Sequence, residues 1–184
     1  MHKGDCFLVP GPVRMSDACL QAMATPVMTA RGPEFRQVMA ELNSGLRYAF
    51  NLSPSAPEMK TQSWTGEDGY KVVVVSGSGT AAMEMVIANR FRNNDLVLVP
   101  TNGKFGERVA DICRQFCNVK HLQYEWGRSF DLYELEQQLD RGCYEALLIC
   151  HNETSSGITQ DAEAIAEMCE RHGVSFILDG ITSV

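Results

Sequence analysis

Four short stretches of this chain combine glycine with hydroxyl, amide or charged side chains. They lie at residues 76–80, 101–106, 151–157 and 179–183. In the first, Ser78-Gly79-Thr80 stands directly before a helical run, and a helix start offers free backbone N–H groups and a positive dipole end to phosphate. In the last, Asp179 leaves an apolar run and offers a carboxylate. The chemistry indicated is phosphate binding beside an acid.

The elements that must position these stretches alternate between apolar runs and helical patterns. We predict strands at 72–75, 96–99, 119–124, 146–150 and 174–178, and helices after the first four. The four consecutive valines at 72–75 are typical of a strand covered on both faces. This alternation predicts an α/β fold with a mostly parallel sheet covered by helices. The carboxyl ends of parallel strands meet at one edge, so we expect the four stretches to form one site.

Helix boundaries have their own signals. Asp131 begins a capping-box-like helix that ends near residue 141, and Gly173 closes the helix before the last strand. Nearer the N-terminus, Ser16 is a good N-cap for a short helix, and Pro33 suits the first turn of an amphipathic helix of about 16 residues. Residues 1–15, with Pro10, predict an extended arm, and the polar residues 51–70 predict a surface connection.

Composition limits the class of protein. The chain has 184 residues, a net charge of −7 and 45% hydrophobic residues, as expected of a soluble globular protein with no nucleic-acid or membrane surface. Seven cysteines are scattered through predicted helices and strands, which favours free thiols in a reducing compartment such as the cytoplasm. Cys113 and Cys117 lie four residues apart with no second pair, so we predict no metal site.

A dinucleotide enzyme is the first alternative, because the run from Gly77 to Ala82 matches G-x-G-x-x-A. That fold needs an acid at the end of the next strand, for the ribose hydroxyls. The position holds Pro100-Thr101-Asn102 instead. The motif match is therefore not supported by its context.

The ordered set of motifs is far more specific. Four runs, in this order, closely resemble the large domain of class V aminotransferases. They are Ser78-Gly79-Thr80, Asn-Gly-Lys-Phe-Gly-Glu-Arg at 102–108, the run at 151–157, and Asp179-Gly-Ile-Thr-Ser at 179–183. These are pyridoxal 5′-phosphate (PLP) enzymes of fold type I. The opening Pro10-Gly-Pro12 resembles the N-terminal arm of the family. The similarity is greatest to alanine- or serine-glyoxylate aminotransferases, followed by 2-aminoethylphosphonate–pyruvate aminotransferases.

The resemblance implies a role for each candidate residue. Asp179 is the catalytic acid beneath the pyridine nitrogen, where it favours the protonated ring. Ser78, Gly79 and Thr80 hold the phosphate. Phe105 stacks on one ring face, Ile181 packs on the other and Thr154 bonds the ring hydroxyl, while ordinary core or turn roles for these three stay open. His151 is either part of the pocket floor or a structural histidine.

The resemblance also implies that this is an N-terminal portion, with an arm at 1–15 and an incomplete PLP-binding large domain at 16–184. The Schiff-base lysine of the family lies beyond the counterpart of Asp179, and Lys3, Lys60, Lys71, Lys104 and Lys120 do not match it. The expected parent enzyme is a homodimer that moves an amino group from alanine or serine to glyoxylate or pyruvate, and we expect this chain alone to be inactive. Two alternatives stay open: a non-catalytic PLP- or phosphate-binding fragment that needs a second chain, and a PLP lyase or epimerase of the same fold.

Overall fold

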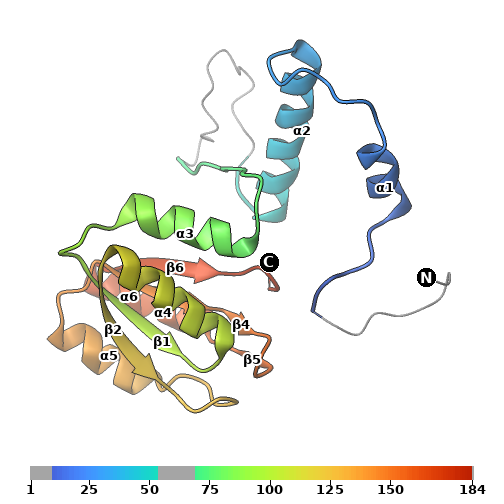
Figure 1. Cartoon of the computed structure of the whole chain (residues 1–184). Helices are drawn as coiled ribbons and strands as arrows, with labels where there is room; N and C mark the ends of the chain where they lie inside the picture. The colour runs from blue at the N-terminus through green and yellow to red at the C-terminus, as the bar shows by residue number, and fades with distance from the viewer. Residues whose placement is uncertain (1–9, 54–68, 184) are drawn as a thin grey trace. The chain divides into compact units, whose positions relative to one another are not determined.

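A computed structural model describes residues 10–53 and 69–183 of the chain (Figure 1). The structure divides into two compact units, one within residues 1–75 and the other at residues 76–183. The predicted connection at 51–70 lies largely outside the described residues, as does most of the predicted arm. The division at residues 15 and 16 stays a prediction.

The N-terminal unit contains α1 (Asp17–Met23) and α2 (Pro33–Ala49). Both predicted helix starts are confirmed: the Ser16 hydroxyl accepts the Cys19 N–H at 3.2 Å, and Pro33 occupies the first turn of α2. Two α2 side chains, Asn43 and Arg47, are buried, and Arg47 is the charged one, at 1% exposure. Its guanidinium donates to the Tyr70 carbonyl at 3.0 Å and to the Ser53 carbonyl, so its burial is compensated by hydrogen bonds.

The second unit is built on a four-stranded parallel sheet in the order β2-β1-β3-β6. The strands are β1 (Leu96–Thr101), β2 (Asn118–Gln123), β3 (Ala146–Cys150) and β6 (Ser175–Asp179). Four helices connect them or lead into them: α3 (Gly79–Arg90), α4 (Lys104–Phe116), α5 (Leu132–Arg141) and α6 (Ala162–His172). The predicted α/β fold with a parallel sheet is confirmed.

Each face of the sheet carries its own core. Val97 and Val99 point to one face and pack with residues of α3 and α4, including Ile87 and Ile112. Leu98 points to the other face and packs with residues of α5 and α6. Because side chains alternate along a strand, the continuous apolar runs of β1 and β3 are buried on both faces. Figure 1 shows the helices of this unit around its strands.

The signals at the helix ends of this unit are confirmed. The Asp131 carboxylate accepts the Glu134 N–H at 3.1 Å and starts α5. Gly173 ends α6 with φ of 65°, a left-handed conformation that favours glycine. Ser78 is the N-cap of α3, where its hydroxyl accepts the Ala81 N–H at 3.3 Å.

The strand predicted at 72–75 is wrong. These residues form no strand in the described structure, and Val73 and Val75 are 66% and 47% exposed. The run has the apolar, β-branched composition of a buried strand, but a strand also needs neighbours for its backbone groups. The four-stranded sheet of residues 96–179 does not include it. A second difference is a small antiparallel hairpin that begins in the predicted loop at 151–157 and ends just after it, formed by β4 (Asn152–Glu153) and β5 (Ile158–Thr159).

The six cysteines among the described residues are all free thiols, which agrees with the sequence. No helix in the described part of the chain is long and apolar enough to cross a membrane.

Candidate active site

The structure brings the four polar stretches together at the carboxyl ends of β1, β3 and β6. Arg108 donates to the Thr80 hydroxyl at 3.3 Å, which joins the first stretch to α4. The Lys104 N–H donates to the Ser155 hydroxyl at 2.8 Å, which joins the second stretch to the third. The Asn152 amide donates to the Thr182 hydroxyl at 3.0 Å, which joins the third to the fourth. One continuous set of loops results, as the parallel sheet predicts.

The N-terminus of α3 is the open anion-binding end of this site. Gly79 and Thr80 are the first two helical residues, so their N–H groups have no acceptor within the helix. Ser78 is exposed, and Gly79 and Thr80 are half-buried. The positive end of the helix dipole and the nearby Arg108 guanidinium add favourable charge. These groups suit a phosphate.

Asp179 presents an unpaired acceptor to the same site. Its Oδ1 accepts the Ile181 N–H at 3.2 Å. Its Oδ2 is buried and has no hydrogen-bond partner among the described residues. Buried polar atoms are almost always paired, so this oxygen can accept a hydrogen bond from a ligand donor in the cavity. A protonated pyridine nitrogen is such a donor, and the residues present therefore fit PLP.

An apolar cavity of about 260 Å³ connects these two features. Gly79 and Asp179 both line it, together with Ile181, which is 71% exposed at its mouth. Its remaining walls come from α3, α4, β3, β6 and the loop after β6: Ala82, Met83, Val86, Ile87, Val109, Leu148, Ile149, Ile177, Leu178 and Gly180. A Cβ on Gly79 would lie 2.9 Å from the Ile181 side chain, so the glycine keeps the cavity open.

Phe105 lies in the first turn of α4 and Thr154 in the turn between β4 and β5, and neither lines the cavity. Phe105 is half-buried, and the Arg108 guanidinium stands 5.1 Å from the centroid of its ring. The buried core of α4 begins only with Gly106 and Val109, so Phe105 is not a core residue of that helix. Thr154 is half-buried in the turn between β4 and β5. Thus Gly79, Asp179 and Ile181 share one cavity, and the other candidates surround it.

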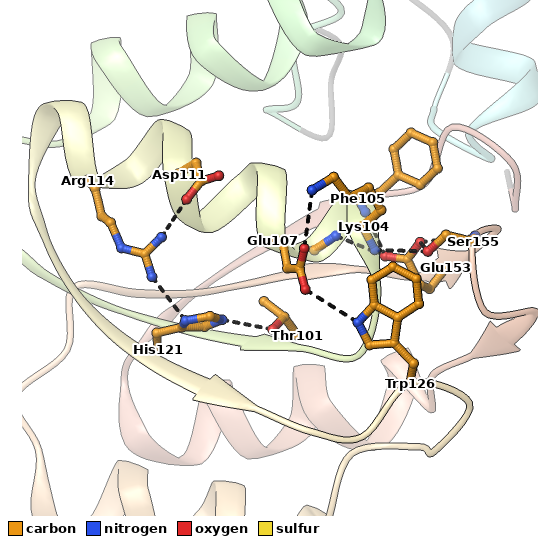
Figure 2. Close-up of polar contacts among 11 residues, drawn as sticks. Thr101, Lys104, Phe105, Glu107, Asp111, Arg114, His121, Trp126, Glu153 and Ser155 are labelled. Atoms are coloured by element: carbon orange, nitrogen blue, oxygen red, sulfur yellow. Dashed lines mark hydrogen bonds and ion pairs between the residues drawn. The ribbon is translucent and has the colours of Figure 1, made fainter.

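Glu153 is a site residue that the sequence reasoning missed. Its side chain is completely buried, and its carboxylate accepts the N–H groups of Phe105 at 3.0 Å and Gly106 at 2.9 Å (Figure 2). The other carboxylate oxygen accepts the N–H and hydroxyl of Ser155. The only available signal was an acid inside a predicted polar loop, where a solvated side chain is the ordinary expectation.

A polar chain supports the end of β1 beneath α4 (Figure 2). Asp111 accepts from Arg114 at 2.6 Å, and Arg114 donates to His121 Nδ1 at 2.9 Å. Because Arg114 can only donate, His121 must carry its proton on Nε2 and donate to the Thr101 hydroxyl at 2.8 Å. Burial, and then the Arg114 charge, lower the pKa of His121, which keeps the imidazole neutral.

Cys150 and His151 do not form a nucleophile pair. Cys150 lies opposite Asp179 in the sheet, and burial, reinforced by the charges of Asp179 and Glu153, raises the pKa of its thiol to about 12. The thiol is therefore protonated and unreactive at neutral pH. His151 Nδ1 lies 2.7 Å from the Ser183 hydroxyl, which ties the third stretch to the fourth.

The parallel sheet, the open start of α3 and the unpaired acid at one cavity are compatible with a PLP-binding domain. The sequence matches the family model for aminotransferase class-V over residues 28–184, and the chain belongs to this family. The resemblance expected from the ordered motifs is thus confirmed.

Individual relatives cover the same region. The chain is 31% identical over 183 residues to the "soluble hydrogenase 42 kDa subunit" of Anabaena cylindrica, with 97% of this chain and 44% of that protein aligned. It is 28% identical to the (S)-ureidoglycine–glyoxylate transaminase of Bacillus subtilis, over 97% of this chain and 39% of that one. The crystal structure of an alanine–glyoxylate aminotransferase from Nostoc sp. superposes with a TM-score of 0.81 at 31% identity, over 100% of this chain and 46% of that one. The chain therefore spans less than half the length of the relatives it matches.

Proposed function

We infer that this chain forms the cofactor-binding, N-terminal portion of a PLP-dependent aminotransferase. The observation that carries the proposal is the pairing of two features in one cavity. The Oδ2 of Asp179 is buried without a partner, and the first helical residue of α3, Gly79, lines the same cavity. PLP has a phosphate for one feature and a ring nitrogen for the other.

Each residue has a stated task in this proposal. The N–H groups of Gly79 and Thr80, with the hydroxyls of Ser78 and Thr80, bind the phosphate. The carboxylate of Asp179 accepts a hydrogen bond from the protonated pyridine nitrogen, and its negative charge keeps that nitrogen protonated.

The faces and edge of the ring are covered by three further side chains. Phe105 and Ile181 cover the two faces and exclude water, and Thr154 donates to or accepts from the ring hydroxyl. Bound PLP supplies an electron sink at the substrate carbon, and Asp179 supports that chemistry by keeping the ring nitrogen protonated.

The substrates, assembly and location are part of the proposal. Two relatives carry glyoxylate as the amino acceptor in their names. We propose a small amino acid such as alanine or serine as donor and a 2-oxo acid such as glyoxylate or pyruvate as acceptor. A cytoplasmic homodimer is proposed, with the covalent lysine supplied by residues outside this sequence or by a second chain.

Reversible PLP binding and amino-group transfer can be measured separately. Purified chain is saturated with PLP, treated with borohydride to fix any imine, and digested for mass spectrometry. We expect reversible PLP binding without a stoichiometric adduct at Lys71, Lys104 or Lys120. A single fully modified lysine within residues 1–184 would show that the chain holds its own covalent lysine, and our assignment would be wrong.

Amino-group transfer is followed with ¹⁵N-alanine and glyoxylate, and with ¹⁵N-serine and either glyoxylate or pyruvate. We expect ¹⁵N in glycine or alanine when the lysine-bearing segment is present, and none with residues 1–184 alone. Elimination or racemisation of the labelled donor, without transfer, would instead identify a lyase or an epimerase. Binding without any reaction in the completed protein would identify a non-catalytic PLP module.

A further inference from the structure

Glu153 connects the first turn of α4, which carries Phe105, to the turn between β4 and β5, which carries Thr154. We propose that Glu153 is a positioning residue that fixes these two side chains relative to each other and so sets the orientation of the cofactor ring. The inference rests on the proposed function, because it assumes that Phe105 and Thr154 contact the ring.

The two carboxylate oxygens of Glu153 serve different loops. Oε2 accepts the N–H groups of Phe105 at 3.0 Å and Gly106 at 2.9 Å, at the start of α4. Oε1 accepts the Ser155 N–H at 3.1 Å and the Ser155 hydroxyl at 2.5 Å, in the turn after β4. Oε2 therefore binds the backbone of Phe105 itself. Oε1 binds Ser155, so Thr154 lies in sequence between two residues that are hydrogen-bonded to each other, Glu153 and Ser155.

Glu153 is packed closely against the backbone before α4. Its side chain has no exposed area, and a Cβ on Gly103 would lie 2.4 Å from its Cγ. The backbone before α4 thus passes directly over the carboxylate. The Ser155 hydroxyl also accepts the Lys104 N–H at 2.8 Å, which closes a ring of hydrogen bonds between the two loops (Figure 2).

Charge explains why this position needs a carboxylate. The N-cap of α4 is Gly103, which has no side chain to cap the helix, and Glu153 compensates the free N–H groups and the positive dipole end. The α4 start is therefore satisfied by the chain's own carboxylate. The α3 start, by contrast, keeps its first N–H groups available for a phosphate.

Glutamine cannot replace this carboxylate, although it has the same shape. Each oxygen of Glu153 faces two donors, and a glutamine amide supplies only one oxygen. In one orientation its NH₂ group faces two donors, the N–H groups of Phe105 and Gly106, and in the other it faces the Ser155 N–H, while the Ser155 hydroxyl can turn to accept. One loop must then move away from the other, and Phe105 and Thr154 lose their fixed relation.

The test compares a ligand that has a ring with one that has only a phosphate. PLP and glycerol phosphate are titrated into wild-type chain, Glu153→Gln and the matched control Glu163→Gln, which changes an exposed first-turn glutamate of α6. For Glu153→Gln we expect PLP affinity to fall about tenfold or more, because Phe105 and Thr154 no longer hold their positions at the ring, while glycerol phosphate affinity changes less than about twofold. The induced circular dichroism of bound PLP should also change at saturation.

Ser155→Ala is the milder variant if Glu153→Gln does not fold. It keeps the carboxylate and removes only the hydroxyl bonds, so we expect the same pattern at smaller size. Unchanged PLP affinity and dichroism in these variants would overturn the proposal. An equal loss for both ligands would also overturn it, because that result means general loosening. If wild-type chain does not bind PLP, the proposed function itself fails, which is a separate outcome.

Discussion

Replacing Asp179 with asparagine removes the charge and keeps the shape of the side chain. The asparagine oxygen can still accept the Ile181 N–H, now 3.2 Å from Oδ1, so the loop after β6 should keep its conformation. The Nδ2 atom then occupies the position of the buried, unpaired Oδ2. An N–H donor in place of this oxygen cannot accept a hydrogen bond from the protonated pyridine nitrogen.

The expected magnitude follows from the bond that is lost. A hydrogen bond with a charged partner contributes about 1.5–3 kcal/mol in a buried site. The dissociation constant for PLP should therefore rise by about 10- to 150-fold in Asp179→Asn. The cavity walls are unchanged by this substitution, so loss of shape does not contribute.

The assay is a PLP titration followed by absorbance and by induced circular dichroism. Asp140→Asn is the matched control, since it makes the same chemical change on an exposed side chain of α5. Thermal unfolding of the cofactor-free proteins checks that all three are folded. An Asp179→Asn affinity within about twofold of wild type would refute the assignment of Asp179 as the pyridine partner, since that change is below about 0.5 kcal/mol.

Three further predictions follow from the same structure. Gly79→Ala should weaken PLP binding several-fold without unfolding α3, because the added Cβ meets Cδ1 of Ile181 at 2.9 Å. Ile181→Val in the same chain removes that atom but keeps a branched side chain for the ring face, so it should restore much of the binding; no restoration would contradict the steric reasoning. The fold lowers the pKa of His121, so the free energy of unfolding should fall as pH drops through the unfolded pKa of about 6.5. In urea unfolding, His121→Asn should lose less stability than wild type between pH values of about 7.5 and 5.5. Equal losses of stability in the two proteins would contradict this prediction. In the native chain a thiol reagent should modify the exposed Cys19 and Cys143 quickly, whereas Cys113 and Cys150, whose pKa values burial raises to about 12, should react only on unfolding.

Local signals predicted much of the second unit. β1 and β3 are continuous apolar runs bounded by polar turns, and such runs are buried in a parallel sheet wherever neighbours exist. Asp131 and Gly173 act within a few residues of their own position, so the sequence alone was sufficient to locate those helix ends.

The valine run at 72–75 has the same local signal and fails for a non-local reason. Strand formation depends on backbone groups supplied by other segments, and the described sheet supplies none to this run. Local composition cannot report which segments become neighbours.

In the candidate site, too, some residues could be predicted from the local sequence and others depend on distant segments. Asp179 was predictable as an acid that ends an apolar strand. That its Oδ2 is buried without a hydrogen-bond partner among the described residues depends on packing, which the sequence does not report. Glu153 was not predictable, because its four hydrogen-bond donors come from two loops about 50 residues apart in sequence. Only the folded arrangement of α4 against the β4–β5 turn makes this acid a buried, fully paired group.

The central claim is that PLP binds with its phosphate at the start of α3 and its ring nitrogen at Asp179. The most direct measurement is a ¹H–¹⁵N NMR titration of the isotopically labelled chain with PLP. We expect the amide signals of Gly79, Thr80 and Ile181 to shift together and saturate at one PLP per chain, while that of Tyr133 on α5 stays unchanged. Gly79 and Thr80 signals that do not move at saturating PLP would contradict the account.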